Sequence, residues 1–255
     1  MIPRVLIIGA TGELGGAIAL GYARGGANLV LWGRDVERLG RIASACEAAG
    51  ARHVQTRSID LTGVDAALIA LADECEAGCF DTAVFAAGLG DIRERGWVAE
   101  DGATVARLGL VNFIAPAALA SALGARMAAQ GRGSLVFIGS AAAFHALPFA
   151  TAYAASKAGL ARFADALRIN LRPHGVRVTL VSPGFIDTAA AHRVPGPKPL
   201  MLSPDNAAAH IIKAAANGRA HLVMPWPFAI LRLLDRLMPR FLRDRLLRSL
   251  TPPGR

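Results

Sequence analysis

Val5-Leu-Ile-Ile8-Gly9-Ala-Thr-Gly12-Glu-Leu-Gly15-Gly16 is the segment from which the rest of this chain is best interpreted. Its four apolar residues predict a buried strand, and the amphipathic residues 17–24 after the glycines predict a helix. In a strand–turn–helix unit, glycines let the backbone turn tightly and approach a pyrophosphate, whose negative charge the helix N-terminus favours. The segment therefore indicates a dinucleotide site, with a flexible strand-to-helix connection as the alternative.

Apolar runs and amphipathic stretches alternate along the remainder of the chain. After the first strand at residues 4–8, we predict strands at residues 28–32, 53–59, 81–86, 134–139, 176–181 and 220–224, and helices at residues 36–49, after a cap at Thr62, at 101–130 and from the tyrosine region to about 172. This alternation predicts a single-domain, doubly wound α/β fold of the Rossmann type, with a parallel sheet covered on both faces. Ligands bind at the carboxyl edge of such sheets, which here would gather Gly9, Asp60, Gly88 and Ser140.

Length and composition suit a cytoplasmic globular protein. The 255 residues fit one α/β domain, or two small ones, and no composition shift marks an internal boundary. A strand that starts at residue 4 leaves no room for a signal peptide, and without a run of 18 apolar residues we expect no membrane-spanning helix. Cys46, Cys75 and Cys79 lack disulfide or metal-ligand spacing. Cys75 and Cys79 could share a helix face, but we expect buried thiols and no metal site.

The net charge of +9 is concentrated in residues 226–255, a basic amphipathic helical tail that follows a main domain of residues 1–225. The tail holds seven arginines against two aspartates, so more than half of the excess charge lies there. The main domain is close to balanced and carries no nucleic-acid-binding motif, which argues against a nucleic-acid partner. The tail arginines are Arg232, Arg236, Arg240, Arg243, Arg245, Arg248 and Arg255.

A second segment, from Ser140 to Lys157, carries the candidate chemistry. Tyr153 and Lys157 are four residues apart, so on a helix they share one face. A hydroxyl, a phenol and an ammonium together suit proton transfer to or from an alcohol or carbonyl oxygen, because a neighbouring cation lowers the phenol pKa from about 10. An ordinary amphipathic helix with a surface lysine is the alternative.

Asn112 lies amid apolar residues, and a buried amide needs hydrogen-bond partners. It is either a packed amide bonded to the backbone or part of a relay to Lys157.

The residues after the second predicted strand bear on the choice of cofactor. An acidic residue at this position binds the adenosine ribose hydroxyls, whereas an arginine nearby accommodates a 2′-phosphate. Gly33 stands where the acid usually lies and Arg34 follows, which favours NADP. Asp35 complicates this interpretation, although it could instead cap the helix that begins at Val36.

Together these residues resemble the short-chain dehydrogenase/reductase family over roughly residues 4–224. Ser140 precedes Tyr153 by thirteen residues, as in that family, and Asn112, Ser140, Tyr153 and Lys157 match its catalytic tetrad. The resemblance implies hydride transfer between C4 of nicotinamide and the carbon of an alcohol or ketone. It implies that Tyr153 is the general acid/base and that Lys157 lowers its pKa and binds the nicotinamide ribose. Ser140 would orient the substrate oxygen, and Asn112 would hold a proton-relay water.

The resemblance also implies the cofactor contacts: the glycine turn, an adenine contact at Asp60-Leu61 and a nicotinamide-side loop at Pro183-Gly184 with Thr188. We expect the cofactor-binding residues to be Gly9, Thr11, Gly12, Glu13, Leu14, Gly15, Arg34, Asp60, Leu61, Ala87, Gly88, Tyr153, Lys157, Pro183, Gly184, Ile186 and Thr188.

Three features depart from the family's usual pattern. The glycine spacing is that of extended members, with Glu13 where single-domain members usually carry glycine. The usual Asn-Asn-Ala-Gly after the fourth strand is Phe85-Ala86-Ala87-Gly88, which loses a structural amide. Gly12 stands where many NADP-preferring members place a basic residue, so Arg34 alone supports NADP.

The segment after Thr188, residues 189–202 with Pro195, Pro197 and Pro199, is interpreted as a loop that in this family covers the substrate. It is short and apolar, and His192, Arg193 and Lys198 are its charged candidates. Phe144, His145, Leu147 and Phe149 are expected to border the same pocket; His145 either touches substrate or is an exposed loop histidine. These residues favour an apolar or lipid-like carbonyl or alcohol substrate over a sugar.

Two short amphipathic helices, separated at Pro239, are predicted after the break at Pro225-Trp226-Pro227. An apolar stripe lies on one face and Arg232, Arg236 and Arg240 on another. Three interpretations are open: packing on the domain or a partner subunit, peripheral contact with an anionic membrane, or binding of an acidic partner. The stripe contains Ile230, Leu231, Leu234, Leu237, Met238 and Phe241.

An NADP-dependent oxidoreductase, forming a homo-oligomer in the cytoplasm or at the membrane surface, is the leading hypothesis. A dinucleotide-sensing regulator or scaffold without turnover is a second, and loss of the tyrosine or lysine would be its signature, but both are present. A tyrosine-dependent epimerase or dehydratase with bound nicotinamide is a third. Against it, the chain lacks the length for the extra substrate domain that such enzymes usually have.

Overall fold

The computed structural model describes residues 2–90, 98–194 and 196–249, without the side chain of Arg236. Pro195, Arg255 and the side chain of Arg236 therefore lie outside the described residues. Seven parallel strands form one sheet in the order β3-β2-β1-β4-β5-β6-β7, which confirms the predicted fold class. The strands are β1 (Arg4–Ile8), β2 (Asn28–Gly33), β3 (His53–Ser58), β4 (Thr82–Phe85), β5 (Gly133–Ile138), β6 (Val176–Pro183) and β7 (His221–Met224).

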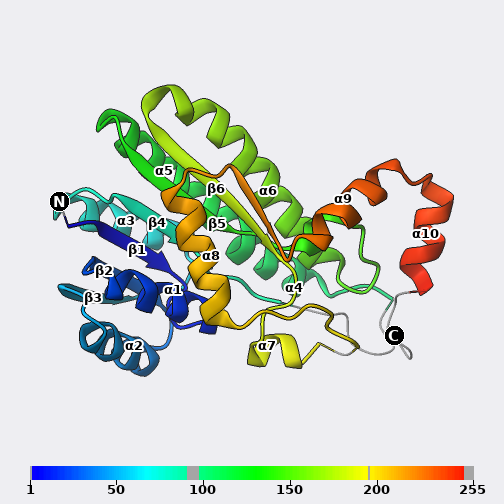
Figure 1. Ribbon diagram of the computed structural model, residues 1–255, viewed down its shortest axis with the longest axis horizontal. Coiled ribbons are helices and arrows are strands. Elements are labelled where there is room, and N and C mark those ends of the chain that lie inside the picture. The colour runs from blue at the N-terminus through cyan, green and yellow to red at the C-terminus, as the bar shows by residue number, and fades with distance from the viewer. Residues whose placement is uncertain (1, 91–97, 195, 250–255) are drawn as a thin grey trace.

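Helices cover both faces of the sheet (Figure 1). On one face, α1, α2 and α8 pack over a core that includes Ile7, Leu31 and Ile211; on the other, α3, α5 and α6 pack over a core that includes Leu6, Phe137 and Leu160. The helices are α1 (Glu13–Arg24), α2 (Val36–Ala48), α3 (Val64–Glu76), α4 (Gly102–Gly109), α5 (Ala115–Ala129), α6 (Thr151–Leu171), α7 (Ala189–His192), α8 (Pro204–Ala216), α9 (Pro227–Leu237) and α10 (Arg240–Ser249).

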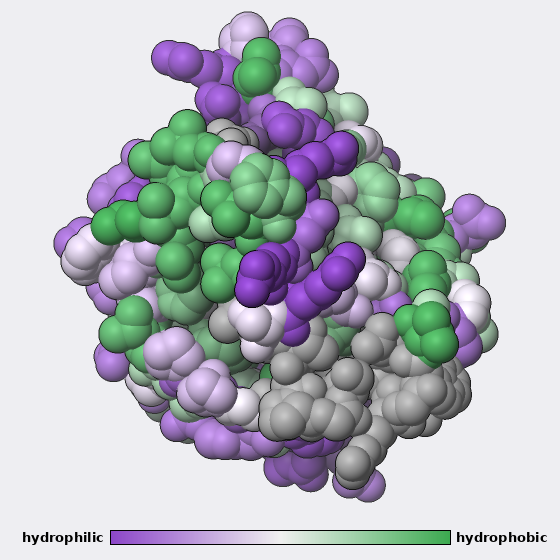
Figure 2. Space-filling model, turned by 90° about the vertical axis from the view of Figure 1, so that its right-hand side faces the viewer, coloured by the Kyte–Doolittle hydropathy of each residue, from purple (hydrophilic) through white to green (hydrophobic). Residues whose placement is uncertain are grey.

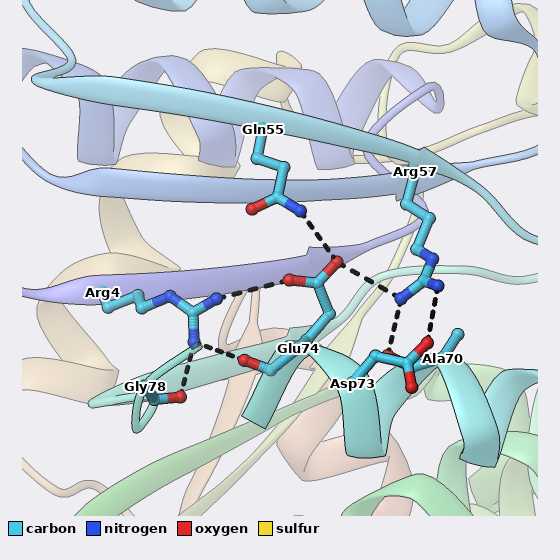
Figure 3. Close-up of polar contacts among 7 residues, drawn as sticks. All are labelled: Arg4, Gln55, Arg57, Ala70, Asp73, Glu74 and Gly78. Carbon is cyan, nitrogen blue, oxygen red and sulfur yellow. Dashed lines mark hydrogen bonds and ion pairs between the residues drawn. The ribbon is translucent and has the colours of Figure 1, made fainter. Parts of the chain in front are cut away.

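The central strands are apolar because both of their faces are buried, as expected for a parallel sheet. The edge strand β3 instead carries polar residues, and its Gln55 and Arg57 reach the carboxylate of Glu74 on α3 (Figure 3). Glu74 is also paired with Arg4 of β1 at 3.3 Å. This charged cluster ties α3 to two strands of the sheet.

Two predictions about local structure are wrong. Thr62 does not cap α3, because Gly63 is the N-cap and the Thr62 hydroxyl and N–H both donate to Asp60 Oδ1 at 2.9 Å. Cys79 shares no helix face with Cys75, since α3 ends at Glu76, and its thiol is exposed rather than buried.

The helical run Gly102–Ala129 is long and apolar enough to cross a membrane by length and composition alone. However, 56% of its most apolar window is buried within the fold, as expected for a helix that covers a sheet.

Candidate active site

The carboxyl edge of the sheet brings the four predicted catalytic residues into one region. Ser140 follows β5, while Tyr153 and Lys157 lie near the start of α6. Asn112 lies in a π-helical turn, Leu110–Ile114, that joins α4 to α5. Such turns insert one extra residue per turn and are frequent at functional sites.

The Ser140 side chain is close enough to the Tyr153 phenol to lower its pKa. Ser140 Oγ accepts from the N–H of Ala142 at 3.1 Å, which fixes the serine at the start of the short helical turn Ala141–Phe144. Burial raises the pKa of the Tyr153 phenol, and the Ser140 side chain offsets part of that rise. The phenol is therefore neutral at pH 7, in the form that can donate a proton.

Lys157 is a buried cation with 4% of its surface exposed. Its Nζ donates to the carbonyl oxygen of Ile138, the last residue of β5, at 2.9 Å. Burial lowers the pKa of Lys157 to about 8, so most molecules keep the proton at pH 7. The Tyr153 pKa is thus raised overall, contrary to the expected lowering, because burial of the phenol is the largest effect on it.

Asn112 is fully buried, and its amide is held by the backbone. Its Oδ1 accepts from Leu89 N at 2.7 Å, and its Nδ2 donates to Leu89 O at 2.9 Å and to Ser156 Oγ at 3.1 Å. These contacts are those of the packed-amide interpretation, and the relay to Lys157 stays a prediction. A Cβ at Gly88 would lie 3.2 Å from Lys157 Nζ and 3.6 Å from Asn112 Oδ1, so glycine keeps the approach to both groups open.

The glycine turn after β1 is built as predicted. Gly9 has φ +94°, and a Cβ there would lie 2.4 Å from Ala87 N, so only glycine fits between the ends of β1 and β4. A Cβ at Gly15 would lie 2.1 Å from Gly9 O. Gly12 is the N-cap of α1 without a side-chain cap, which leaves first-turn N–H groups available to an anion. This turn fits a dinucleotide pyrophosphate.

The residues predicted for the adenosine end lie beside the glycine turn. A Cβ at Gly33 would collide with the Thr11 side chain at 2.6 Å. Asp35 accepts from Arg38 N at 3.0 Å, so it caps α2 as the alternative interpretation held, while Arg34 is exposed. The Asp60 carboxylate has a lowered pKa, mainly because it accepts from Thr62. The Leu61 side chain is 6% exposed and belongs to the core, so only its backbone can face a ligand.

The loop after β6 continues the sheet edge. Gly184 N donates to Met224 O at 2.8 Å, and a Cβ at Gly184 would lie 2.5 Å from the Phe228 ring. Ile186 forms an isolated bridge with Leu202, which closes residues 187–201 into a loop. This segment is not wholly irregular as predicted, because Thr188 caps the short helix α7 by accepting from Ala191 N.

The sequence profile of the short chain dehydrogenase family matches residues 3–197. The chain belongs to the short-chain dehydrogenase/reductase family. An uncharacterized oxidoreductase of Myxococcus xanthus is 32% identical over 249 residues, covering 96% of each chain. Among solved structures, a short-chain dehydrogenase from Sphingobium yanoikuyae in complex with NADPH has a TM-score of 0.81 at 26% identity, covering 100% of this chain and 98% of that one.

A ketone-specific alcohol dehydrogenase from Comamonas testosteroni, named for bulky-bulky ketones, has a TM-score of 0.78 at 25% identity and covers 100% of this chain and 96% of that one. This short-chain dehydrogenase/reductase is accordingly an oxidoreductase, and NAD(P) is the cofactor typical of its family. The homo-oligomer expected above stays a prediction.

Sequence reasoning missed Glu13 as a contact between the glycine turn and the loop, and Glu100 as a support of α6. The Glu13 carboxylate accepts from Ala189 N at 2.9 Å, at the start of α7. Glu100 accepts from Thr151 N at 2.7 Å and from the Thr151 hydroxyl, at the first residue of the helix that carries Tyr153. Burial raises the Glu100 pKa, but these hydrogen bonds outweigh it and lower the pKa overall. Glu100 lies 51 residues from Thr151, and Glu13 lies 176 residues from Ala189, so no local motif could reveal either contact.

His145 is neither an exposed loop histidine nor free toward the site. Its side chain is 20% exposed, and its Nδ1 lies 3.0 Å from Asp235 Oδ1 of α9. Phe144 likewise turns toward α9 and β7, with its ring centroid 6.1 Å from that of His221. A cavity of about 250 Å³ lies behind this loop, between α6 and α9, and none of the four tetrad residues lines it. The substrate pocket expected beside Tyr153 stays a prediction.

Proposed function

We propose that this protein is an NADP-dependent oxidoreductase that interconverts an apolar or lipid-like ketone and the corresponding secondary alcohol. The observation that carries the proposal is that the Ser140 hydroxyl adjoins the half-buried Tyr153 phenol, with the buried Lys157 ammonium one helical turn along α6. A neutral phenol with a fixed hydroxyl neighbour suits protonation of a carbonyl oxygen that is receiving negative charge.

Each of the site residues has a separate role in the proposed reaction. Tyr153 donates its phenolic proton to the substrate oxygen during reduction and takes it back during oxidation. Ser140 donates a hydrogen bond to the same oxygen and orients it. Lys157, protonated at pH 7, stabilises the phenolate that Tyr153 becomes. The nicotinamide cofactor, when bound along the glycine turn and the Pro183–Thr188 loop, supplies or accepts the hydride.

The preference for NADP is supported by Arg34. The position before it is Gly33, which cannot repel a phosphate, and Asp35 is engaged in capping α2. An exposed guanidinium here suits bidentate binding of a 2′-phosphate. A solved relative of the same fold binds NADPH.

An apolar substrate is supported by the loop that follows β6. The short helix α7 presents three consecutive alanines, and Leu200 in the same loop is 54% exposed. The Comamonas testosteroni enzyme of similar fold is named as specific for bulky ketones. A cytoplasmic location is also proposed, and it is supported by three free cysteines.

A parallel screen of ketones with NADPH and with NADH, followed by absorbance of the reduced cofactor, tests the proposal. We expect turnover of at least one bulky ketone with a preference for NADPH of about tenfold or more. Arg34→Leu should remove most of that preference, since one phosphate contact contributes about 1.5–3 kcal/mol, whereas the exposed Arg38→Leu control should keep it. Equal use of both cofactors by the wild-type enzyme would contradict the NADP assignment. Epimerised product without net cofactor oxidation would favour the epimerase alternative.

A further inference from the structure

Helix α9 packs against the domain with polar side chains, contrary to the usual amphipathic arrangement. Asp235 approaches His145, and Arg232 Nη1 lies 2.9 Å from His221 Nδ1. The Arg232 guanidinium also lies over the Phe144 ring, 5.0 Å from its centroid. Phe228, one turn before Arg232, packs against Gly184. The packing interpretation of the tail is therefore confirmed for this inner face alone.

The apolar stripe of the tail faces away from the domain. Of the seventeen large hydrophobic side chains that are exposed within the described residues, nine lie in the short segment 226–246. Leu237 is 73% exposed and Phe241 is 72% exposed. The α9–α10 face consists of Trp226, Ile230, Leu231, Leu233, Leu234, Leu237, Phe241, Leu242 and Leu246.

Figure 1 shows α9 and α10 projecting from one end of the molecule, and Figure 2 shows hydrophobic side chains at that end interleaved with hydrophilic ones. Apolar surface concentrated at one place marks an interaction site, because scattered single residues are the ordinary case.

The charge on this face indicates its partner. Arg240, Arg245 and Arg248 of α10 are exposed, and residues 226–249 contain six arginines against two aspartates. Two copies of such a face would repel each other, whereas an anionic surface would attract it. Exposed leucines and phenylalanine beside arginines, with a tryptophan at the start, are typical of helices that lie at a membrane interface.

We propose that the α9–α10 face docks this protein on an anionic lipid bilayer. The leucines and Phe241 enter the acyl boundary, and the exposed arginines meet lipid phosphates. The inner face of α9 meanwhile contacts Phe144 and His145, which follow Ser140, and Gly184 of the loop after β6. If the proposed function holds, docking brings the substrate loops to the bilayer, where a lipid-like ketone would partition.

Co-sedimentation of the full chain with vesicles tests the docking without any turnover. We expect binding to vesicles of phosphatidylcholine with about one third phosphatidylglycerol, and at least tenfold weaker binding to phosphatidylcholine alone. Leu234→Glu/Leu237→Glu should lower binding more than tenfold, while the control pair Ile69→Glu/Ile169→Glu, which is exposed on the main domain to a similar extent, should not.

Arg240→Gln/Arg245→Gln should weaken binding to the anionic vesicles by roughly 30-fold, at about 1 kcal/mol for each arginine. Arg24→Gln/Arg52→Gln, an exposed pair on the main domain, serves as the charge control. Circular dichroism shows whether each variant is folded.

Three results would overturn the proposal. The wild-type chain could fail to sediment with either kind of vesicle. It could also bind equally to both kinds, with binding unchanged in Leu234→Glu/Leu237→Glu. It could also form a dimer in analytical ultracentrifugation that Leu234→Glu/Leu237→Glu dissociates, which would make a second copy the occupant of this face. Loss of ketone turnover with vesicle binding retained would count against the proposed function alone.

Discussion

Glu74 and Lys157 are similarly buried, with 3% and 4% of their surfaces exposed, but their surroundings are opposite. Glu74 receives hydrogen bonds or ion pairs from Arg4, Gln55 and Arg57, so its charge is compensated on several sides. Lys157 donates to the carbonyl of Ile138, and within residues 2–90, 98–194 and 196–249 no carboxylate pairs with it.

We interpret this difference as the one between a structural charge, that of Glu74, and a charge that the proposed function uses, that of Lys157. Burying an ion costs several kcal/mol, which a surrounding set of opposite charges can offset. The Glu74 cluster does this and thereby joins α3 to β1 and β3. Lys157 keeps most of its desolvation cost, which is why its pKa falls to about 8. A fold tolerates such a group where the charge is needed for chemistry.

Lys157→Met should give the largest difference between the effect of a substitution on turnover and its effect on the free energy of unfolding. Removing the cation should lower turnover by about 10²–10⁴-fold, because the phenolate of Tyr153 loses its stabilising charge. The free energy of unfolding should stay equal or rise, since an unpaired buried charge is replaced by an apolar group of similar length. Steady-state kinetics and urea unfolding measure the two effects, with the exposed Lys213→Met as control. A variant that loses stability along with activity would argue for a structural lysine.

Glu74→Gln should show the opposite pattern. Arg4 and Arg57 would keep their charges without the carboxylate, which costs about 3 kcal/mol in the free energy of unfolding. Turnover per folded molecule should stay within about twofold, because Glu74 pairs with Arg4 at the first residue of β1, whereas Tyr153 follows the carboxyl end of β5. Glu76→Gln on the same helix, exposed and outside the cluster, is the matched control. Equal stabilities of the two variants would remove the structural role assigned to Glu74.

The pH dependence of the free energy of unfolding gives a further test of whether the Lys157 charge is uncompensated. Lys157 has a pKa of about 8 when folded, below the ordinary value of 10.5, so between these pH values the unfolded chain binds more protons. The free energy of unfolding contributed by this group should therefore rise with pH, by about 2 kcal/mol from pH 8 to 9.5. Urea unfolding across this window should show the rise in wild type and not in Lys157→Met. Parallel curves for both proteins would mean that the lysine is not desolvated.

Much of the fold could be predicted from the sequence because its signals are local. Each strand was placed to within two residues, and for the central strands the reason is that unbroken apolar runs mark strands buried on both faces. The glycine turn was recognisable because Gly9 and Gly15 meet backbone at distances that exclude a side chain. Of the tetrad, Tyr153 and Lys157 lie four residues apart on α6 as predicted.

Contacts between distant segments could not be predicted. Arg4, Gln55 and Glu74 meet only after three elements have assembled. For α9, the pattern showed which residues share a face but not which face packs inward. That orientation depends on His145 and His221, which lie 90 and 11 residues away from their partners Asp235 and Arg232.

Ketone turnover by Tyr153→Phe, measured beside Tyr22→Phe, tests the central claim most directly. These are the two tyrosines of the chain, and burial raises the pKa of both, that of Tyr22 to about 12. With saturating reduced cofactor, Tyr153→Phe should lose about 10²–10⁴-fold in turnover while cofactor fluorescence still reports binding, and Tyr22→Phe should remain near wild type. Near-wild-type turnover in Tyr153→Phe with cofactor bound would contradict the assignment of Tyr153 as the proton donor.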